Sequence, residues 1–237
     1  VVCDFRSKDV SLKGQGAPLV PIGDKLLFHE YDFCLNLGGI SNISFDKNGE
    51  RIAYDIGLAN MPLNYITHKM GLAYDENGKI ARSGKLNHAL LQKLNNLTYY
   101  ALPYPKSTGY EWFSSEITPL IEGSKLSNED LLHTFIHHNC EQIAFAALKH
   151  KNNGKSKSKL LATGGGALNQ FFMDTLQNKL GSSIEVVVPT KTLIAYKEAL
   201  VFALMGVLRL EGETNVLKSV TGATSDSCSG EVFFPSN

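Results

Sequence analysis

Two glycine clusters are the first residues of this sequence whose types and spacing could do chemistry. Gly164, Gly165 and Gly166 follow an apolar stretch and precede a segment typical of a helix. Glycine lets backbone N–H groups approach an anion closely, and the N-terminal end of a following helix adds a positive partial charge. Gly38 and Gly39 lie within an expected hairpin, where backbone amides can also wrap a phosphate. Each cluster predicts an anion site, with a tight turn or close backbone packing as the alternative.

Asp4 is the first carboxylate that could serve in catalysis. It follows the mostly apolar residues 1–3, which read as the end of a buried strand. A carboxylate at a strand end can project into a cleft and take a proton from a hydroxyl or a water molecule. The alternative is an exposed aspartate paired with Arg6.

A second group of polar residues follows the expected hairpin. Asp55 ends the returning strand, and Asn60 and Asn64 come next at helical spacing. They suit contacts to metal-bound water or phosphate, or simply the capped start of a helix. Further on, the segment 106–109 offers an ammonium and two hydroxyl groups, from Lys106, Ser107 and Thr108. That set suits a polyhydroxylated or anionic ligand, and a plain surface turn is the alternative.

Familiar motifs of other chemistries are absent or incomplete. The chain has no Gly-x-x-x-x-Gly-Lys-Ser/Thr sequence, and the glycines at 164–166 lack the third glycine and the acidic residue of a dinucleotide fingerprint. His133 and His137 lie four positions apart, with Cys140 and Glu141 one turn further, which is a spacing that could hold zinc. No second paired spacing completes the site, so we predict that these histidines bind no metal.

Alternating strand and helix patterns indicate an α/β fold. We expect strands at 31–45, 51–56, 159–162 and 184–188, and helices at 61–70, 86–97, 128–149, 167–180 and 196–210. Asp46-Lys47-Asn48-Gly49 predicts a hairpin turn, which makes the sheet mixed rather than purely parallel. Asn128 is the expected N-cap of the longest helix, and the order of the tail after residue 219 stays open.

The composition is that of an ordinary globular protein. Of the 237 residues, 43% are hydrophobic and 19% are charged, and the formal net charge is zero. This balance argues against a broad electrostatic surface for nucleic acid or for anionic membrane. No apolar run approaches the roughly 20 residues of a membrane span. Four widely spaced cysteines read as reduced thiols, so we expect a cytoplasmic protein. The chain begins within an apparent buried strand, so we expect an upstream portion.

Seven segments, in order along nearly the whole chain, resemble the anhydro-N-acetylmuramic acid kinase family. These are Asp4-Phe5-Arg6 with Asp9, Gly14–Pro21, Asn36–Asn42, Asp55–Asn60, Pro105–Gly109, Gly164–Asn169 and Val220–Ala223. The resemblance implies an actin-like ATPase (ribonuclease H-like) fold with a mixed sheet flanked by helices, in a two-lobed kinase that uses ATP and Mg²⁺. It places residues 1–34 at the end of the N-terminal lobe and in the interlobe connection, and residues 35–237 in the C-terminal ATPase lobe.

The resemblance also implies roles for particular residues. Asp4 is the expected catalytic base, facing the interlobe cleft. The expected nucleotide contacts are Gly38, Gly39, Asn42, Gly164, Gly165, Gly166 and Asn169. The expected sugar contacts are Lys106, Ser107, Thr108 and Glu198. No residue is assigned as a direct metal ligand, and Asp55 is a candidate for contact with Mg²⁺ through water.

The implied reaction is phosphoryl transfer from ATP to an amino sugar. Water attacks the anomeric carbon of 1,6-anhydro-N-acetylmuramic acid, and O6 receives the γ-phosphoryl group, giving N-acetylmuramic acid 6-phosphate in peptidoglycan recycling. The family suggests a homodimer, and no nucleic-acid or membrane partner is expected. Ile56, Asn64 and Tyr110 depart from the family pattern, and the family's N-terminal phosphate hairpin is absent. We therefore expect this chain alone to be inactive, and a non-catalytic binding module of the same fold is the alternative.

Overall fold

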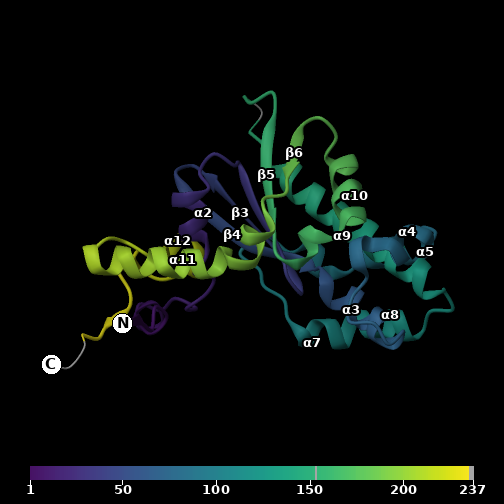
Figure 1. Cartoon of the computed structure of the whole chain (residues 1–237), viewed down its shortest axis with the longest axis horizontal. Coiled ribbons are helices and arrows are strands. Elements are labelled where there is room, and N and C mark those ends of the chain that lie inside the picture. Colours follow the sequence, from purple (N-terminus) through teal and green to yellow (C-terminus); the bar gives the residue numbers. More distant parts are fainter. Residues whose placement is uncertain (153, 235–237) are drawn as a thin grey trace. The chain divides into compact units, whose positions relative to one another are not determined.

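The computed structural model describes residues 1–152 and 154–234 (Figure 1), which fall into two compact units. Unit 1 comprises residues 1–30, 44–53 and 195–237, and unit 2 comprises residues 31–43 and 54–194. The strands are β1 (Val2–Cys3), β2 (Phe33–Leu37), β3 (Ile40–Lys47), β4 (Glu50–Leu58), β5 (Ser158–Thr163), β6 (Ile184–Val187) and β7 (Glu231–Val232). They form a two-stranded sheet, β1–β7, and a five-stranded sheet in the order β4-β3-β2-β5-β6.

The helices fill the intervals between the strands. They are α1 (Ser7–Ser11), α2 (Pro21–Leu27), α3 (Asn60–Lys69), α4 (Lys79–Ser83), α5 (His88–Asn95), α6 (Thr98–Ala101), α7 (Tyr110–Trp112), α8 (Thr118–Glu122), α9 (Asn128–His150), α10 (Gln170–Leu180), α11 (Lys191–Glu211) and α12 (Lys218–Thr221). Shorter helical turns are η1 (Glu76–Gly78), η2 (Phe113–Ile117) and η3 (Gly165–Leu168). The α/β class predicted from the sequence is confirmed.

The five-stranded sheet is mixed, as the hairpin signal predicted. β2 pairs with β5 in parallel, with Asn36 opposite Thr163, and β5 pairs with β6 in parallel. β3 and β4 are joined by Asn48 and Gly49, whose φ values of 54° and 84° both lie in the left-handed region. Two such residues make the type of tight turn that matches the twist of a hairpin. The central strands β2 and β5 are almost fully buried.

Unit 2 surrounds its share of the sheet with helices. α9 is the longest helix, and twelve of its residues are buried because they face α10, α3 and α5. In Figure 1, α10 lies beside α9 and β6. The N-cap of α9 is Ser127, whose side chain accepts from the Asp130 amide, so the predicted cap at Asn128 was one residue too late. A serine hydroxyl in that position satisfies an otherwise unpaired helix amide.

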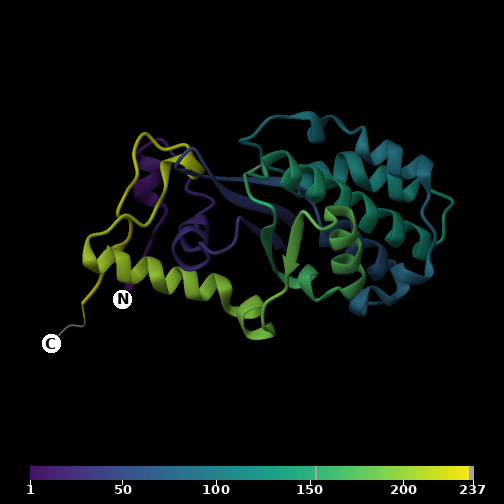
Figure 2. The same ribbon diagram turned by 90° about the horizontal axis from the view of Figure 1, so that it is seen from above.

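Unit 1 has its own core, formed where α2, α11 and α12 meet the N-terminal segment. Its buried members are Phe5, Leu19, Ile22, Val201, Met205, Val216, Leu217 and Val220. The N- and C-terminal segments lie side by side (Figure 2), since Val2 pairs with Val232 in the β1–β7 sheet. Of the tail after residue 219, whose order the sequence left open, residues 220–221 complete α12 and residues 231–232 form β7, and residues 235–237 lie outside the described part.

A buried ion pair links two elements of unit 1. Lys197 on α11 lies 2.6 Å from the Asp24 carboxylate on α2, and both side chains are more than nine-tenths buried. Ser44 also donates to Asp24, and Arg51 donates to Ser44. These contacts satisfy charges that would otherwise be costly to bury. In the part of the chain that the structure describes, no helix is both long and apolar enough to cross a membrane.

Candidate functional site

The two glycine turns lie side by side in unit 2. Both follow parallel neighbours, β2 and β5, so they leave the sheet at the same edge. Gly164 has a φ of 80°, and a Cβ added to it would lie 2.7 Å from the Leu37 carbonyl oxygen. A Cβ added to Gly166 would lie 2.8 Å from Leu37 Cβ. The two glycine clusters, in which Gly39 and Gly165 are 126 positions apart, are therefore neighbours in the structure. Gly164 and Gly166 are close-packed against Leu37, so both positions require glycine.

Gly39 and Gly165 differ from their neighbours because each has open space beside it. Gly165 is exposed, and no atom lies within 4 Å of a Cβ built on it. A Cβ on Gly39, also exposed, would meet only Met61, at 3.6 Å. Close backbone packing, the alternative to an anion site, thus explains Gly164 and Gly166. It does not explain Gly39 or Gly165, where a ligand could approach the backbone.

Asn60 holds the first turn against the start of α3. Its side chain donates to the Leu37 carbonyl at 2.9 Å, and its backbone amide donates to the Gly38 carbonyl at 3.1 Å. The amides of Ala59 and Met61 both donate to the Gly39 carbonyl. The N-terminal amides of α3 are thus used by the turn, which assigns Asn60 a positioning role rather than one as a phosphate or metal-water ligand.

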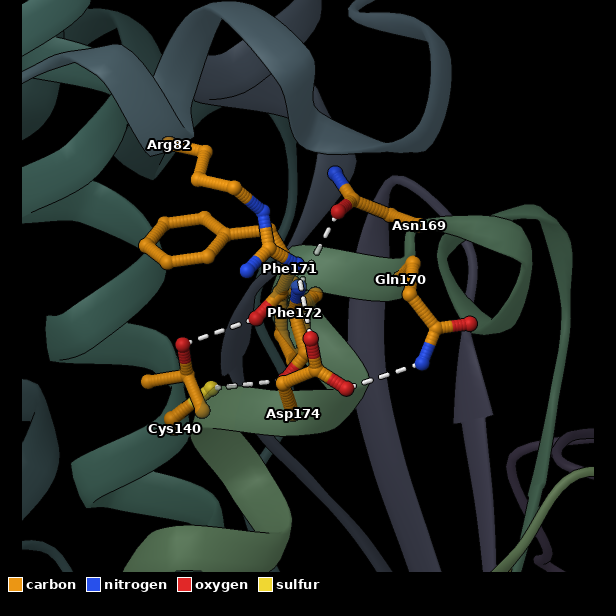
Figure 3. A network of polar contacts seen from close by, with 8 residues as sticks. Arg82, Cys140, Asn169, Gln170, Phe171, Phe172 and Asp174 are labelled. Carbon is orange, nitrogen blue, oxygen red and sulfur yellow. Dashed lines mark hydrogen bonds and ion pairs between the residues drawn. The ribbon is translucent and has the colours of Figure 1, made fainter.

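Asn169 is placed next to the second turn, at the start of α10 (Figure 3). Its side chain accepts from the Phe172 amide at 3.0 Å, which makes it the N-cap of that helix. Gly78 packs against it, because a Cβ there would lie 2.3 Å from Asn169 Oδ1. Arg82 on α4 forms an ion pair at 2.6 Å with Asp174, which lies on α10 (Figure 3).

Two neighbours of this corner were missed by the sequence reasoning. The Arg82 guanidinium lies 5.1 Å from the Phe171 ring centroid, and Gly78 has a φ of 69°. The Asn77-Gly78 dipeptide, a turn signal, was the one local hint. Asn42, predicted as a nucleotide contact, is half-buried on β3.

Asp4, in unit 1, is exposed and has an unusual backbone. Its φ is 51°, in the left-handed region that aspartate tolerates better than most residues. Its carboxylate accepts from the Ser7 amide at 3.1 Å, and hydrogen bonding to Ser7 lowers the pKa of the carboxyl. Arg6 donates instead to the Gly16 carbonyl, and no Asp4–Arg6 ion pair occurs in the described residues. Asp4 is therefore ionised at neutral pH, as a proton acceptor must be.

Asp9 is a structural residue that ties three of the family-like segments together. It is fully buried and accepts from the Gly16 amide at 2.8 Å and from the Thr221 hydroxyl at 2.7 Å. The Gln15 amide donates to the Thr221 carbonyl. A Cβ on Gly14 would lie 2.1 Å from the Asp9 carboxylate, so only glycine fits there. The Gly14–Gly16 loop and the Thr221 segment therefore form one cross-link.

Asp55, on β4 of unit 2, lies against the segment 106–108. Its half-buried carboxylate accepts from the Thr108 amide at 3.1 Å, and its own amide donates to the Lys106 carbonyl. Burial raises the pKa of the Asp55 carboxyl. The Thr108 hydroxyl is buried and has no hydrogen-bond partner in residues 1–152 and 154–234, while Ser107 is exposed. An underpaired carboxylate beside an unpaired hydroxyl suits a polar ligand or a hydrated cation.

Lys106 turns away from Ser107 and Thr108. Its ammonium donates to the Tyr99 carbonyl at 3.1 Å and lies 4.4 Å from the centroid of the Tyr99 ring. Glu198 is exposed on α11, in unit 1. The predicted site residues thus fall into two sets, with Asp4 and Glu198 in unit 1 and all the others in unit 2.

The histidines of α9 make contacts within unit 2. His133 contacts the Ala81 carbonyl through Nδ1 at 2.9 Å and stacks on His137, with ring centroids 4.7 Å apart. His138 is held between Asn95 and Tyr100, and burial lowers its pKa to about 3. Among the described residues, no group of three or more potential ligands that could hold a metal occurs. The absence of zinc here stays a prediction.

Fold and site together define an α/β protein with glycine turns at one edge of its sheet, and comparison with known proteins places it more closely. Residues 1–235 match the family model described as Anhydro-N-acetylmuramic acid kinase, and the chain belongs to this family. Curated relatives named anhydro-N-acetylmuramic acid kinase are 37% identical in Aliivibrio fischeri and 36% identical in Vibrio cholerae. The matches cover 100% and 99% of this chain. The chain spans about 65% of the length of either relative.

Among solved structures, the activator of the 2-hydroxyisocaproyl-CoA dehydratase from Clostridium difficile, with bound ADPNP, has a TM-score of 0.47 and 16% sequence identity. The match covers 81% of this chain and 66% of that chain.

Proposed function

We propose that this chain is the larger part of an ATP-dependent kinase that converts 1,6-anhydro-N-acetylmuramic acid and water to N-acetylmuramic acid 6-phosphate. The observation that carries this proposal is the pairing of two glycine turns at the same edge of the sheet, with Gly39 and Gly165 open to a ligand. Family membership over residues 1–235 supports the choice of reaction. In this reading the fold is that of an actin-like ATPase, and the protein acts in the cytoplasm in cell-wall recycling.

The nucleotide is assigned to the glycine turns. The Gly38–Gly39 turn contacts the phosphates, and the Gly164–Gly166 turn with Asn169 borders the adenosine. Asn42 completes this set. In phosphoryl transfer the protein takes little part in covalent chemistry. Positioning of the reactants and stabilisation of charge therefore provide most of the rate enhancement.

Mg²⁺ is the expected companion of ATP, and Asp55 fits a hydrated ion. Burial raises the pKa of the Asp55 carboxyl, so the charged carboxylate is not fully stabilised by its contacts within the protein. The Thr108 hydroxyl, which has no hydrogen-bond partner among the described residues, lies on the segment that contacts Asp55. Hard cations such as Mg²⁺ prefer oxygen ligands and keep several waters. When bound, the ion neutralises phosphate charge. Asp55 would hold it through water.

Asp4 is the proposed general base. Its ionised carboxylate takes a proton from water as the water oxygen bonds to the anomeric carbon and the bond from that carbon to O6 breaks. O6 then bonds to the γ-phosphorus of ATP, and ADP leaves. Ser107, Thr108, Lys106 and Glu198 are the proposed sugar contacts. This assignment places residues 1–34 at the end of the N-terminal lobe and residues 35–237 in the C-terminal lobe, in a protein that we propose forms a homodimer.

A non-catalytic nucleotide- or sugar-binding module is the second candidate. Ile56, Asn64 and Tyr110 stand where the family pattern has other residues, and these departures favour it. The deciding experiment measures ADP release by the full-length protein with ATP, Mg²⁺ and anhydro-N-acetylmuramic acid, and follows the sugar product by ³¹P NMR. Turnover with formation of the 6-phosphate supports the kinase. Saturable ATP binding without product supports the binding module.

A further inference from the structure

A cavity of about 100 Å³ opens beside the edge strand β4 in unit 2, and of the residues that line it only Lys106 has a part in the proposed reaction. Its wall comes from β4, from the segment 100–106 and from the last turns of α9. Tyr54 and Ile56 line it, whereas Asp55 between them contacts Thr108. Because successive strand residues point to opposite faces, the cavity lies across β4 from the Asp55 carboxylate.

One side of the cavity is lined by a stacked aromatic pair. The rings of Tyr54 and Tyr104 are stacked, with centroids 5.4 Å apart and planes inclined by 10°. His150 meets the Tyr104 ring edge-on at 5.4 Å. Phe145, also lining the cavity, is 63% exposed and adds an apolar edge that a ligand can reach from solvent.

The other chemical feature of the cavity is positive charge without an acidic partner, although the Lys106 ammonium also donates to the Tyr99 carbonyl. Lys106 and Lys149 both line it, and none of the lining residues is acidic. Neither lysine forms an ion pair within residues 1–152 and 154–234. Burial, and then the charge of Lys149, lower the pKa of the Lys106 ammonium. Two like charges beside a partly buried cavity are stabilised by an anion between them.

We propose that this cavity binds a small organic anion with a flat apolar body, whose carboxylate or phosphate group lies at Lys106 and Lys149 and whose body lies on the Tyr54–Tyr104 surface. The aromatic side of the site favours the flat apolar body of such a molecule, and the lysines favour its acidic group. A cavity of this volume has room for about three water molecules at ~30 Å³ each, so it holds part of a flat group and the remainder of the ligand extends to the open side. The proposal does not depend on the kinase activity.

Benzoate is the probe for this site, titrated into the intact protein at low ionic strength and followed by NMR shifts of the tyrosine and histidine rings. We expect saturable binding in the millimolar range, with shifts at Tyr54, Tyr104 and His150. Benzamide, which has the same shape without the charge, and acetate, which has the charge without the ring, should each bind at least about fivefold more weakly. Added salt should weaken benzoate binding, since the contact is electrostatic.

Lys149→Met tests the charge directly, because Lys149 is exposed and its replacement should leave the fold intact. We expect benzoate to bind roughly tenfold more weakly, in line with the loss of one charge-assisted contact. Lys93→Met removes the same charge from an exposed position on α5 and should leave binding unchanged. Unsaturable shifts, equal binding of benzamide, or unchanged affinity in Lys149→Met would each overturn the proposal. ADP release is measured separately, so a failed kinase assay leaves this test intact.

Discussion

At the scale of single residues, the family-like motifs separate into groups that support the fold and groups that remain available to a ligand. Asp9, Gly14, Asn60 and Asn169 are engaged in packing or hydrogen bonds that stabilise turns and helix starts. Asp4 is exposed and ionised, and Gly165 is open. A residue can therefore belong to a family motif because it holds the chain in shape, and the contacts decide which role it has.

Asp4→Asn is the direct test of the proposed base. The substitution keeps the size and most of the hydrogen bonding of the side chain but removes its ability to accept a proton. General-base assistance contributes about 10²–10⁴-fold to a rate, so kcat of the full-length enzyme should fall by at least that order. ATP affinity, measured by calorimetry, should change little, because the proposed nucleotide contacts lie at the glycine turns. Near-wild-type sugar phosphorylation by a folded Asp4→Asn protein would remove Asp4 from the mechanism.

Asp55→Asn probes a carboxyl whose pKa is raised in the folded protein. Because the folded state holds this proton more tightly than the unfolded state, the contribution of Asp55 to stability falls as pH rises through its folded pKa. The variant should therefore be more stable than wild type at pH 7, and the difference should shrink as the pH is lowered toward 4. Urea unfolding at several pH values checks this, without Mg²⁺. Greater stability of wild type at pH 7 would show that hydrogen bonds to the carboxylate outweigh its burial.

At the scale of elements, the sheet brings the glycine turns together. Parallel pairing of β2 with β5 puts both carboxyl ends at one edge, and the hairpin of β3 and β4 returns the chain to α3. Helix α10 then starts at Asn169, immediately after the second turn. The candidate nucleotide site is thus a consequence of strand order, with the helix starts setting how closely the two turns approach.

Gly164→Ala and Gly165→Ala form a matched pair on one turn. A Cβ at Gly164 meets the Leu37 carbonyl at 2.7 Å and sits on a backbone with positive φ, whereas one at Gly165 meets nothing within 4 Å. We expect Gly164→Ala to lose about 1–3 kcal/mol of unfolding free energy, and Gly165→Ala to stay within about 0.5 kcal/mol of wild type. Thermal and urea unfolding measure both. If Gly165 borders the nucleotide, its variant should nevertheless bind ATP more weakly; equal destabilisation of the two variants would contradict the described turn.

At the scale of the whole molecule, the chain combines two compact units, and each draws on segments far apart in the sequence. Unit 1 joins residues 1–30 to residues 195–234 through the β1–β7 sheet and the Asp9 cross-link. Unit 2 is continuous in sequence from residue 31 to residue 194, except for residues 44–53 of the β3–β4 hairpin, which belong to unit 1. The relatives are longer than this chain, so the proposed activity belongs to the full-length protein.

Asp9→Ala tests the link between the two ends of unit 1. The substitution leaves the buried Gly16 amide without its acceptor, at about 1–3 kcal/mol. It leaves the Thr221 hydroxyl only its long 3.4 Å hydrogen bond to the Leu217 carbonyl. We expect a clear loss of thermal stability, and proteolysis that begins within residues 1–30 or 195–234. Thr221→Val removes one of the two bonds and should cost less than Asp9→Ala. If the full-length Asp9→Ala protein has unchanged stability but no kinase activity, Asp9 acts in catalysis rather than in folding.

The sequence by itself determined the features that depend on neighbouring residues. The Asn48-Gly49 turn, the longest helix at 128–150 and the strand before Gly164 follow from local backbone preferences and periodicity, and the ordered motifs identified the family. Helix ends were less accurate: α11 starts at Lys191, five residues earlier than expected, and takes in Leu193 and Ile194.

Only the tertiary structure decided which motif residues face a ligand and which face the core. No local pattern distinguishes Gly164 from Gly165, since the difference lies in the distance to Leu37, a contact between distant parts of the chain. The same is true of Asp9, whose acceptor role depends on Thr221, and of Lys106, whose ammonium turns from Thr108 toward Tyr99. Side-chain environment is set by long-range packing, which local sequence does not encode.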